Sequence, residues 1–337
     1  MSACRRIVLA SRPAGAPTLD NFRIETGPIP VPGKGQLLIR TRYLSLDPYM
    51  RGRMSTAPSY AQPVAIGDTM EGEVVAEVVE SRAADYQAGD LVRSRVGWCT
   101  HAVTQSEDVR RIPVGTVPIT TYLGVLGMPG FTAYAGMKII GQPKHGETLV
   151  VSAATGPVGS LVGQLAKLAG ARAVGIAGGA AKCNYLVTTL GFDAAIDRHA
   201  EDFARALQEV CPDGIDIYFE NVGGAVWQAV LPLLNRYARV PVCGLIALYN
   251  GVPAESRELW LDTALTVLRR SLLIRGFINS EFASEYYGQF LQEICPLVAS
   301  GQIRYREHFV EGLEAAPSAF IGLLEGRNFG KLIVKVS

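Results

Sequence analysis

The turn AATGPVG, residues 153–159, lies between an apolar run and a segment with helical spacing. It matches the dinucleotide fingerprint GxGxxG at Gly156 and Gly159, while Ala154 stands at the first glycine position. A strand, a glycine turn and a helix N-terminus together form an anion site, because backbone N–H groups and the helix dipole converge there. Pro157 suits the first helical turn, where its missing N–H costs nothing. The turn therefore indicates a dinucleotide phosphate site made by Thr155, Gly156, Val158 and Gly159.

Two cations follow the next two apolar runs. An NAD site usually has an Asp or Glu about 20 residues past the glycines, where it holds the ribose 2′-hydroxyl. Here that run ends at Gly178 without an acid, Lys182 follows it, and Arg198 lies just beyond the third run. Cations in these places favour a 2′-phosphate, so the sequence predicts NADPH rather than NADH. The alternative is that both are ordinary surface residues, as most cations are. Their position at the carboxyl ends of strands favours phosphate binding.

The elements that must position these residues alternate from about residue 148. Apolar runs at 148–153, 173–177, 194–197, 215–220, 237–244 and 272–277 are separated by amphipathic segments. This pattern predicts a doubly wound parallel sheet with crossover helices, and it favours a cofactor turn at 153–159 over a purely structural corner. Residues 36–104 instead hold short strand-like runs, which are typical of a β-rich domain. After about residue 300 the alternation stops, and we expect this tail to return to the first domain.

Composition excludes several classes of protein. The chain has 337 residues, is 48% hydrophobic and carries a net charge of +1, so it has no basic field for nucleic acid. Its six cysteines are scattered and form no CxxC pair, which favours reduced thiols in a cytoplasmic protein. The N-terminal apolar run is too short for a signal peptide, and prolines and glycines interrupt the longer uncharged stretches. We therefore expect neither nucleic acid nor a membrane as a partner.

Motifs along nearly the whole chain resemble one family. They are LSLDPYMRGRM, LGMPGFTAY, AATGPVGSLVGQLAK, LGFDAAID, IDIYFENVGG, VPVCGLIALYN, IRGFINSEF and GRNFGKLIVKV. Together they resemble the zinc-independent branch of the medium-chain dehydrogenase/reductase superfamily, in the group of alkenal double-bond, prostaglandin and curcumin reductases. The resemblance implies an α/β protein with a GroES-like β-barrel catalytic domain over 1–127, a Rossmann NADPH domain over 128–300, and a tail, 301–337, that returns to the catalytic domain. It also implies a cofactor cleft between the domains and a homodimer.

The same resemblance assigns roles to individual residues. It implies that Tyr249 faces the substrate and donates to a developing enolate, and that Tyr49 forms a wall of the substrate pocket. The alternative for both is that they are ordinary half-buried tyrosines. Arg198 stands where many relatives have a tyrosine, which is compatible with phosphate recognition. Ala247 stands where a serine is common, which puts substrate preference in doubt. The further cofactor contacts that it implies are Met128, Thr132, Gly178, Lys182, Tyr185, Arg198, Asn221, Gly223, Cys243, Gly244, Tyr249, Phe277 and Asn328.

No metal site is expected from the spacing of the possible ligands. Cys99 and His101 are the only close Cys/His pair, and two ligands are too few for a zinc ion. The Leu46-Asp47 region stands where zinc-dependent relatives place a metal-binding cysteine. The sequence thus predicts a metal-independent, NADPH-dependent reductase of the carbon–carbon double bond in α,β-unsaturated ketones and aldehydes. A quinone reductase on the same scaffold and a non-catalytic NADPH-binding protein are the alternatives.

Overall fold

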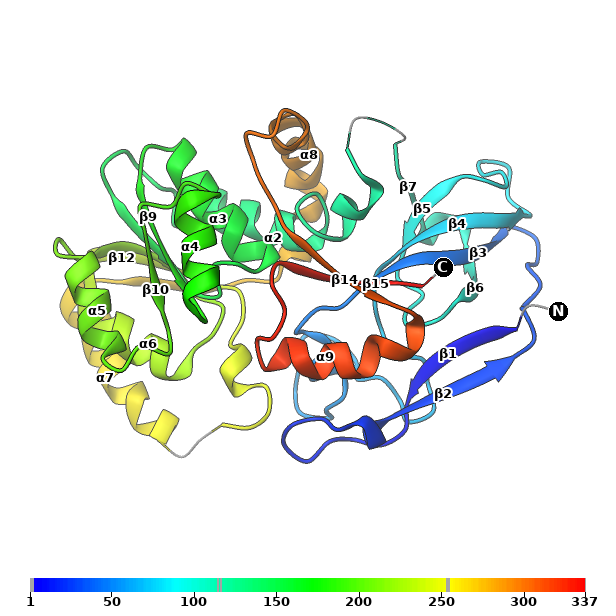
Figure 1. Cartoon of the computed structure of the whole chain (residues 1–337), viewed down its shortest axis with the longest axis horizontal. Coiled ribbons are helices and arrows are strands. Elements are labelled where there is room, and N and C mark those ends of the chain that lie inside the picture. Colours follow the sequence, from blue (N-terminus) through cyan, green and yellow to red (C-terminus); the bar gives the residue numbers. More distant parts are fainter. Residues whose placement is uncertain (1–2, 114, 116, 253–254, 337) are drawn as a thin grey trace. The chain divides into compact units, whose positions relative to one another are not determined.

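The computed structural model describes residues 3–336 apart from 114, 116, 253 and 254. Two compact units form: Met1–Leu123 together with Glu307–Ser337, and Gly124–Arg306 (Figure 1). Within the described residues, the helices are all too short or too polar to cross a membrane.

The second unit is built on six parallel strands in the order β10-β9-β8-β11-β12-β13. They are β8 (Thr148–Val151), β9 (Arg172–Ala177), β10 (Ala194–Asp197), β11 (Ile215–Phe219), β12 (Leu234–Val242) and β13 (Leu273–Gly276). The chain runs outward from β8 to β10 and then returns to β11 beside β8. The strand order therefore reverses between β8 and β11, where ligands bind in such sheets. The predicted Rossmann sheet is confirmed, and each of its strands overlaps one predicted apolar run.

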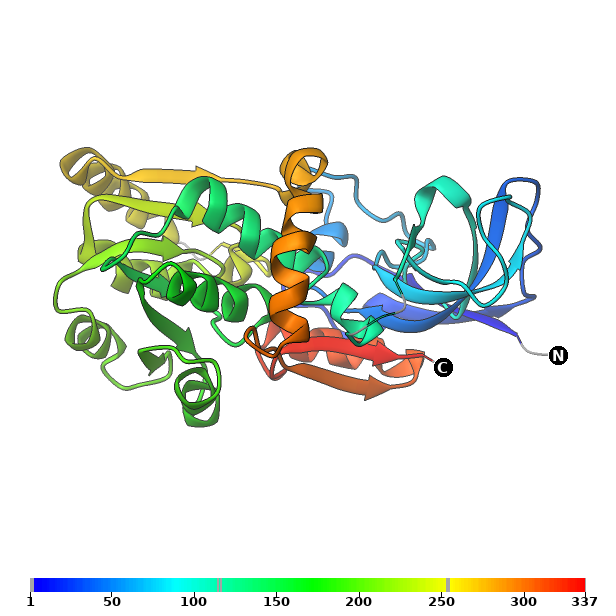
Figure 2. The ribbon, with the colours of Figure 1, turned by 90° about the horizontal axis from the view of Figure 1, so that it is seen from above.

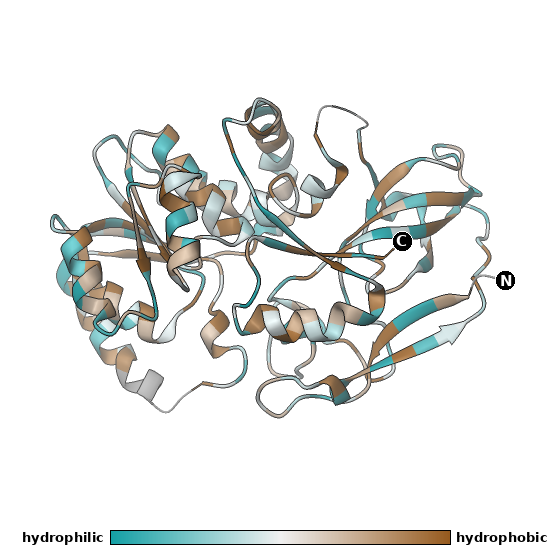
Figure 3. Cartoon of the chain, viewed as in Figure 1, coloured by the Kyte–Doolittle hydropathy of each residue, from teal (hydrophilic) through white to brown (hydrophobic). Residues whose placement is uncertain are grey.

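Helices cover both faces of this sheet (Figures 1 and 2). They are α2 (Met128–Ala135), α3 (Pro157–Leu168), α4 (Ala180–Thr188), α5 (Phe203–Val210), α6 (Gly224–Val230), α7 (Glu255–Arg270) and α8 (Ala283–Ala299), with a π-helical stretch at Gly136–Gly141 after α2. Val174 and Ile176 of β9 join a buried cluster with Leu207 of α5, whereas Gly175 between them faces Leu186 of α4. Side chains alternate along a strand, so α4 and α5 lie on opposite faces. Figure 3 colours β9 and β10 largely as hydrophobic, as expected for strands that lie between helices.

The first unit is centred on a long strand, β3 (Gln36–Ser45). One edge of β3 pairs with β4, and its other edge pairs with β6 near its start and with β15 near its end. The remaining strands and helices are β1 (Cys4–Leu9), β2 (Phe22–Gly27), β4 (Val74–Ser81), β5 (Leu91–Ser94), β6 (His101–Gln105), β7 (Arg110–Arg111), β14 (Glu307–Glu311), β15 (Lys331–Lys335), α1 (Met50–Arg53) and α9 (Ala316–Leu324). Short 3-10 turns in the two units span Leu19–Asn21, Ser106–Asp108, Ile119–Leu123, Leu231–Leu233, Ile246–Leu248, Asn279–Phe282 and Leu313–Ala315.

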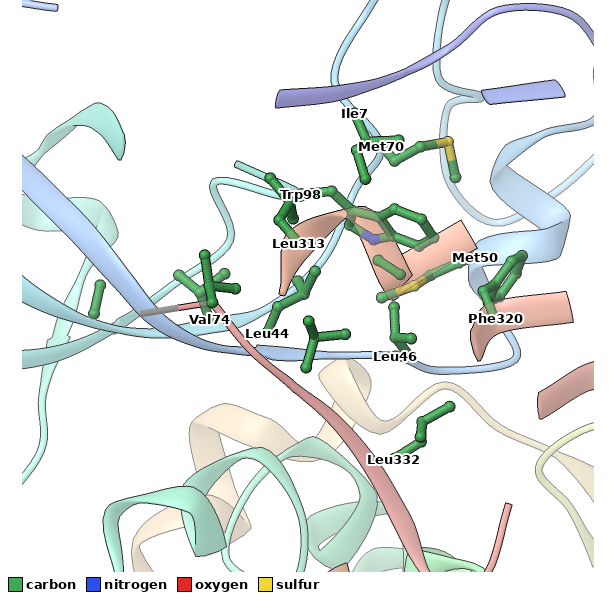
Figure 4. Packing of buried hydrophobic residues seen from close by; sticks show 14 of the residues in the cluster. Ile7, Leu44, Leu46, Met50, Met70, Val74, Trp98, Leu313, Phe320 and Leu332 are labelled. Carbon is green, nitrogen blue, oxygen red and sulfur yellow. The ribbon is translucent and has the colours of Figure 1, made fainter. Parts of the chain in front are cut away.

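The core of this unit is assembled around Trp98 (Figure 4). The indole is fully buried, and it stacks on Phe22 with ring centroids 5.6 Å apart and meets Phe320 edge-on at 5.7 Å. Phe320 comes from α9, and Leu332 of β15 lies in the same cluster. The C-terminal segment thus supplies part of the core into which the N-terminal strands pack.

Candidate active site

The glycine turn after β8 has the geometry of a phosphate-binding turn. Pro157 is the first residue of α3 and Gly156 is its N-cap. A Cβ at Gly159 would lie 2.6 Å from the carbonyl oxygen of Ala153 and 2.7 Å from Cα of Ala154, so only glycine lets α3 approach the strand this closely. Ala153 takes the left-handed conformation, with φ 50°, which normally favours glycine. Ala154 does not, which explains why the first glycine of the fingerprint can be an alanine here.

The start of α3 offers backbone donors to an anion. Gly156 carries no side-chain oxygen, so it cannot accept the N–H groups of Val158 and Gly159 as a Ser or Asp N-cap would. Thr155 is buried beside them. These amides and the positive end of the helix dipole suit a pyrophosphate.

Basic side chains meet at the carboxyl ends of β9 and β10. A Cβ at Gly178 would lie 3.1 Å from Nε of Arg198 and 3.1 Å from Nε2 of His199. Burial, followed by the charge of Arg198, lowers the pKa of Lys182 on α4. Tyr185 lies one turn after Lys182, and the guanidinium of Arg306 is 5.8 Å from its ring centroid. The predicted cofactor contacts included Lys182, Tyr185 and Arg198 but not His199.

Asn221 joins three strand ends at the point where the strand order reverses. Its side-chain amide donates to the carbonyl of Ser152 at 2.8 Å, and its backbone N–H donates to the Ser152 hydroxyl at 2.9 Å. Its side-chain oxygen accepts from the Cys243 thiol at 3.0 Å. Burial, and then the charge of Glu220, raise the pKa of Cys243 to about 12, so this cysteine stays a neutral thiol. Asn221 is therefore fixed in place by β8 and β12.

Glu220 holds the loop that follows Asn221. One carboxylate oxygen, Oε1, accepts from the backbone N–H groups of Val222 at 2.7 Å and Gly223 at 2.9 Å. The same oxygen accepts from the hydroxyls of Tyr218 at 2.9 Å and Ser152 at 3.2 Å. The other oxygen, Oε2, is buried without a hydrogen-bond partner among the described residues. Burial raises the pKa of Glu220 above its ordinary value. The sequence analysis did not single out this residue, because its role depends on contacts that no motif spacing reveals.

Tyr249 stands over Gly244 in the loop after β12. Its hydroxyl lies 3.1 Å from where a Cβ at Gly244 would be, so any larger residue there would press against the phenol. This loop lies beside the residues that follow β11, because the N–H of Gly244 donates to the carbonyl of Glu220 at 3.3 Å. Gly223 has φ +74° and packs against Leu245 of the same loop. Asn221, Gly223, Gly244 and Tyr249, all predicted site residues, are thus brought together.

Met128 and Thr132 lie on the first and second turns of α2. The Thr132 hydroxyl donates to the Met128 carbonyl at 2.8 Å and accepts from the side-chain amide of Asn279 at 2.7 Å. Asn279 is in the motif IRGFINSEF but was not predicted to contribute. Phe277 is buried, with its ring edge-on to Phe219, which leaves its main chain for any contact with a ligand.

Tyr49 and Asn328 belong to the first unit. Tyr49 is the residue before α1, and the guanidinium of Arg53 lies 5.4 Å from its ring centroid. Burial and the carboxylate of Asp47 raise its pKa well above the ordinary value, so the phenol stays protonated. Asn328 donates to the carbonyl of Gly330 at 2.8 Å in the turn before β15. Both residues are therefore described within the first unit alone.

The possible metal ligands do not fit a metal ion. No three His, Cys, Asp or Glu side chains come together to hold one in the part of the chain that the structure describes. Burial raises the pKa of Cys99 to about 12, so it is a thiol rather than a thiolate ligand. Asp47 is already paired, at 2.6 Å, with the ammonium of Lys331.

Comparison with known proteins accounts for this combination of features. Residues 5–112 match the N-terminal domain of oxidoreductase, and residues 157–294 match the family described as zinc-binding dehydrogenase. The chain is 53% identical to the NADPH-dependent curcumin reductase of Escherichia coli K12, covering 99% of this chain and 97% of that protein. It is 39% identical to the NADP⁺-dependent 2-alkenal reductase of Nicotiana tabacum, covering 99% and 97%. The chain belongs to the medium-chain dehydrogenase/reductase superfamily.

Within this superfamily the chain falls in the group of curcumin, alkenal and prostaglandin reductases, as the motifs predicted. It is 38% identical to prostaglandin reductase 1 of Bos taurus over 95% of both chains. A crystal structure of CurA from Vibrio vulnificus in complex with NADPH matches with a TM-score of 0.92 at 50% identity, covering 99% of each chain. The predicted fold class, a GroES-like domain with a Rossmann domain, is confirmed by these matches.

Proposed function

We propose that this protein is an NADPH-dependent reductase of the carbon–carbon double bond in α,β-unsaturated ketones and aldehydes. The observation that carries the proposal is the meeting of Arg198 and His199 at Gly178, directly after β9, with Lys182 on the helix that follows. Cations rather than an acid at this point favour a ribose 2′-phosphate. The names of the E. coli and tobacco relatives support the cofactor and the class of substrate.

The residues present fit this cofactor. Glycine stands at positions 159, 178, 223 and 244, where a Cβ atom would come within 4 Å of neighbouring atoms. The absence of a side chain there lets a ligand approach the backbone. We assign the pyrophosphate to the start of α3 and the 2′-phosphate to the basic cluster. The full proposed cofactor set is Met128, Thr132, Thr155, Gly156, Val158, Gly159, Gly178, Lys182, Tyr185, Arg198, Asn221, Gly223, Cys243, Gly244, Tyr249, Phe277 and Asn328.

Tyr249 is the proposed donor to the substrate. When bound, NADPH supplies a hydride, and addition at the β-carbon leaves negative charge on the carbonyl oxygen of the substrate. The phenol of Tyr249 donates a hydrogen bond to that oxygen and lowers the energy of the enolate. Its loop is fastened to Glu220 and Asn221 by backbone hydrogen bonds, which hold the donor in a fixed position. Tyr49 is the proposed wall of the substrate pocket.

Steady-state turnover tests the proposal directly. NADPH oxidation would be followed by absorbance with a panel of enones and enals and, separately, with simple quinones. We expect turnover with the conjugated carbonyl compounds and saturation of the double bond in the product. Turnover of quinones alone would reject the proposal in favour of a quinone reductase. Tight NADPH binding without oxidation by any acceptor would instead identify a non-catalytic binding protein.

We also propose that the protein is a cytoplasmic homodimer. All six cysteines are free thiols, which supports a reducing compartment. β13 ends the six-stranded sheet, and its residues are largely exposed. Large apolar side chains on α7 and β13 are exposed as well: Trp260 by 72%, Leu261 by 64%, Leu268 by 77% and Leu273 by 49%. An open strand edge beside exposed apolar side chains supports pairing with a second copy.

A further inference from the structure

His199 approaches the same point as Arg198. Both Nε of Arg198 and Nε2 of His199 lie 3.1 Å from the position of a Cβ at Gly178. Gly178 is the residue directly after β9, and the two basic side chains follow β10, so the ends of neighbouring parallel strands bring them together. The imidazole therefore presents a ring nitrogen to the surface on which the guanidinium also lies.

Asp197 fixes the loop that carries His199. Its Oδ1 accepts from the backbone N–H of Gly179 at 2.9 Å and from that of His199 at 3.0 Å. These two hydrogen bonds lower the pKa of Asp197, so the carboxylate stays charged at neutral pH. The loop after β10 is thus tied to the turn before α4, and Gly178 and His199 keep their positions relative to each other.

Basic side chains gather at this end of the sheet. Arg198 and His199 lie side by side at Gly178, and burial, followed by the charge of Arg198, lowers the pKa of Lys182 on α4. Asp197 is in contact with this loop, and its Oδ1 accepts from two backbone N–H groups. Basic side chains that face a glycine surface suit a dianion, and the phosphate of an adenosine 2′-phosphate has the required charge.

We propose that His199 is a third ligand of the 2′-phosphate, beside Arg198 and Lys182, and that it contributes to the preference for NADPH over NADH. This inference rests on the proposed NADPH site and adds to it a residue that determines cofactor specificity. A ring N–H of His199 donates a hydrogen bond to the phosphate, which is charged and therefore a strong acceptor. NADH lacks this phosphate, so its affinity does not depend on the contact.

Calorimetry on the full chain tests the proposal without turnover. The affinities for 2′,5′-ADP and 5′-AMP would be measured for the wild type, His199→Ala and His199→Lys. We expect the wild type to bind 2′,5′-ADP about fivefold more tightly than His199→Ala, the size of one net hydrogen bond. His199→Lys, which keeps a donor, should retain the advantage, and 5′-AMP should not distinguish the three proteins.

A matched control is His145→Ala, which removes an exposed histidine of the same unit before β8 and should leave every affinity unchanged. The proposal is overturned if His199→Ala binds 2′,5′-ADP as tightly as the wild type, or if 2′,5′-ADP binds no better than 5′-AMP. The two proposals fail separately. Weaker binding of 2′,5′-ADP by His199→Ala, but without turnover of any enone by the wild type, would reject the reductase and retain the role of His199.

Discussion

Tyr249 is the residue on which the proposed chemistry depends most. Replacing it by phenylalanine removes the hydroxyl and keeps the ring that rests against Gly244. We expect kcat with an enone to fall by about 10²-fold, the usual loss when one donor to a developing oxyanion is removed. The Kd for NADPH should change little. Stopped-flow turnover and fluorescence titration of the cofactor would measure both quantities.

A matched control is Tyr237→Phe, because Tyr237 is a 63% exposed tyrosine on β12 of the same unit. It should keep wild-type kcat. If Tyr249→Phe also keeps wild-type kcat, the donor to the enolate is another group, and the assignment of Tyr249 is wrong.

Lys182 should discriminate between the two nicotinamide dinucleotides. Lys182 is on α4, which follows β9, so Lys182→Ala removes one charged donor from the proposed phosphate site. We expect KM for NADPH to rise by about tenfold or more, since a hydrogen bond to a charged group contributes ~1.5–3 kcal/mol. KM for NADH should stay the same. Steady-state kinetics with both cofactors would measure the ratio.

Lys167→Ala gives the comparison, because Lys167 pairs with Asp193 on the outer side of α3. Lys167→Ala should change KM for NADPH and KM for NADH only slightly and to the same extent. Equal losses for NADPH and NADH in Lys182→Ala would contradict a phosphate contact and point to a structural role in α4.

Site residues could be predicted where a motif or a strand end marks them. Lys182 and Arg198 follow apolar runs directly, so their positions could be read from the alternation. His199, Glu220 and Asn279 were missed for physical reasons. Glu220 acts through four hydrogen bonds converging on one oxygen, and Asn279 reaches Thr132 across 147 positions of sequence. Such contacts depend on tertiary structure, which local spacing does not encode.

At the scale of elements, the approach of α3 to β8 depends on Gly159. A Cβ there would lie 2.6 Å from the Ala153 carbonyl oxygen, well inside van der Waals contact, so Gly159→Ala must push the helix off the turn. We expect the free energy of unfolding to fall by about 1–3 kcal/mol, as for other overpacked sites. NADPH affinity should fall with it. Urea denaturation and cofactor titration would measure the two effects.

Gly288 of α8 offers the opposite case. It is a helical glycine with nothing within 4 Å of its Cβ position, so Gly288→Ala should leave the fold unstrained. Its free energy of unfolding should rise by up to about 1 kcal/mol from helix propensity. If both alanine variants are equally stable, crowding does not set the distance between α3 and its strand.

The strand β15 is joined to the turn before α1 by a buried ion pair. Lys331 donates to Asp47 at 2.6 Å and to the carbonyl of Leu46 at 2.9 Å, and the Ser45 hydroxyl donates to the second oxygen of Asp47. Asp47→Leu would leave a buried ammonium without its counter-charge. We expect it to lower the free energy of unfolding by about 3–5 kcal/mol. Chemical denaturation of the purified variant would measure this loss.

The double variant Asp47→Leu/Lys331→Met separates charge from packing. Removing both charges should recover much of the stability lost in Asp47→Leu, because no unpaired charge remains. A double variant as unstable as the single one would show that the pair matters through shape and not through electrostatics.

Elements were predictable where hydrophobic periodicity is regular. The runs in the inner strands of the Rossmann sheet, such as β8, are apolar because both faces of these strands are covered by helices. The strands β1, β2 and β14 carry charged residues such as Arg5, Arg6 and Arg23, so hydrophobicity alone does not predict them. They form by pairing, β1 with β2 and β14 with β15. The π-helical stretch at Gly136–Gly141 has no sequence signal of its own. There Gly136 faces Phe219 and Phe277, so tertiary packing selects the backbone conformation.

At the scale of the whole molecule, the two units differ in how the chain builds them. The Rossmann unit is continuous from Gly124 to Arg306, whereas the first unit is completed by the last segment of the chain. Phe320 and Leu332 lie in the core with Trp98, so the first unit cannot bury its core until the C-terminal segment is present. Removal of the segment from residue 307 onward would leave the indole of Trp98 without its edge-on partner.

The assembly proposed for this molecule depends on one edge of its Rossmann sheet. Light scattering of the purified protein should give twice the 36.2 kDa mass of one chain. The double variant Trp260→Lys/Leu273→Lys should give the mass of a single chain, because two charges would lie in the apolar surface of α7 and β13. Leu168→Lys, a similar change at a 48% exposed leucine of α3, should leave the dimer intact. A wild-type protein that stays monomeric at micromolar concentration would contradict the dimer. An ammonium group buried without a partner is costly at the centre of an apolar contact, so the two lysines should disrupt an interface formed by α7 and β13. If the double variant still forms a dimer, the interface lies on another surface.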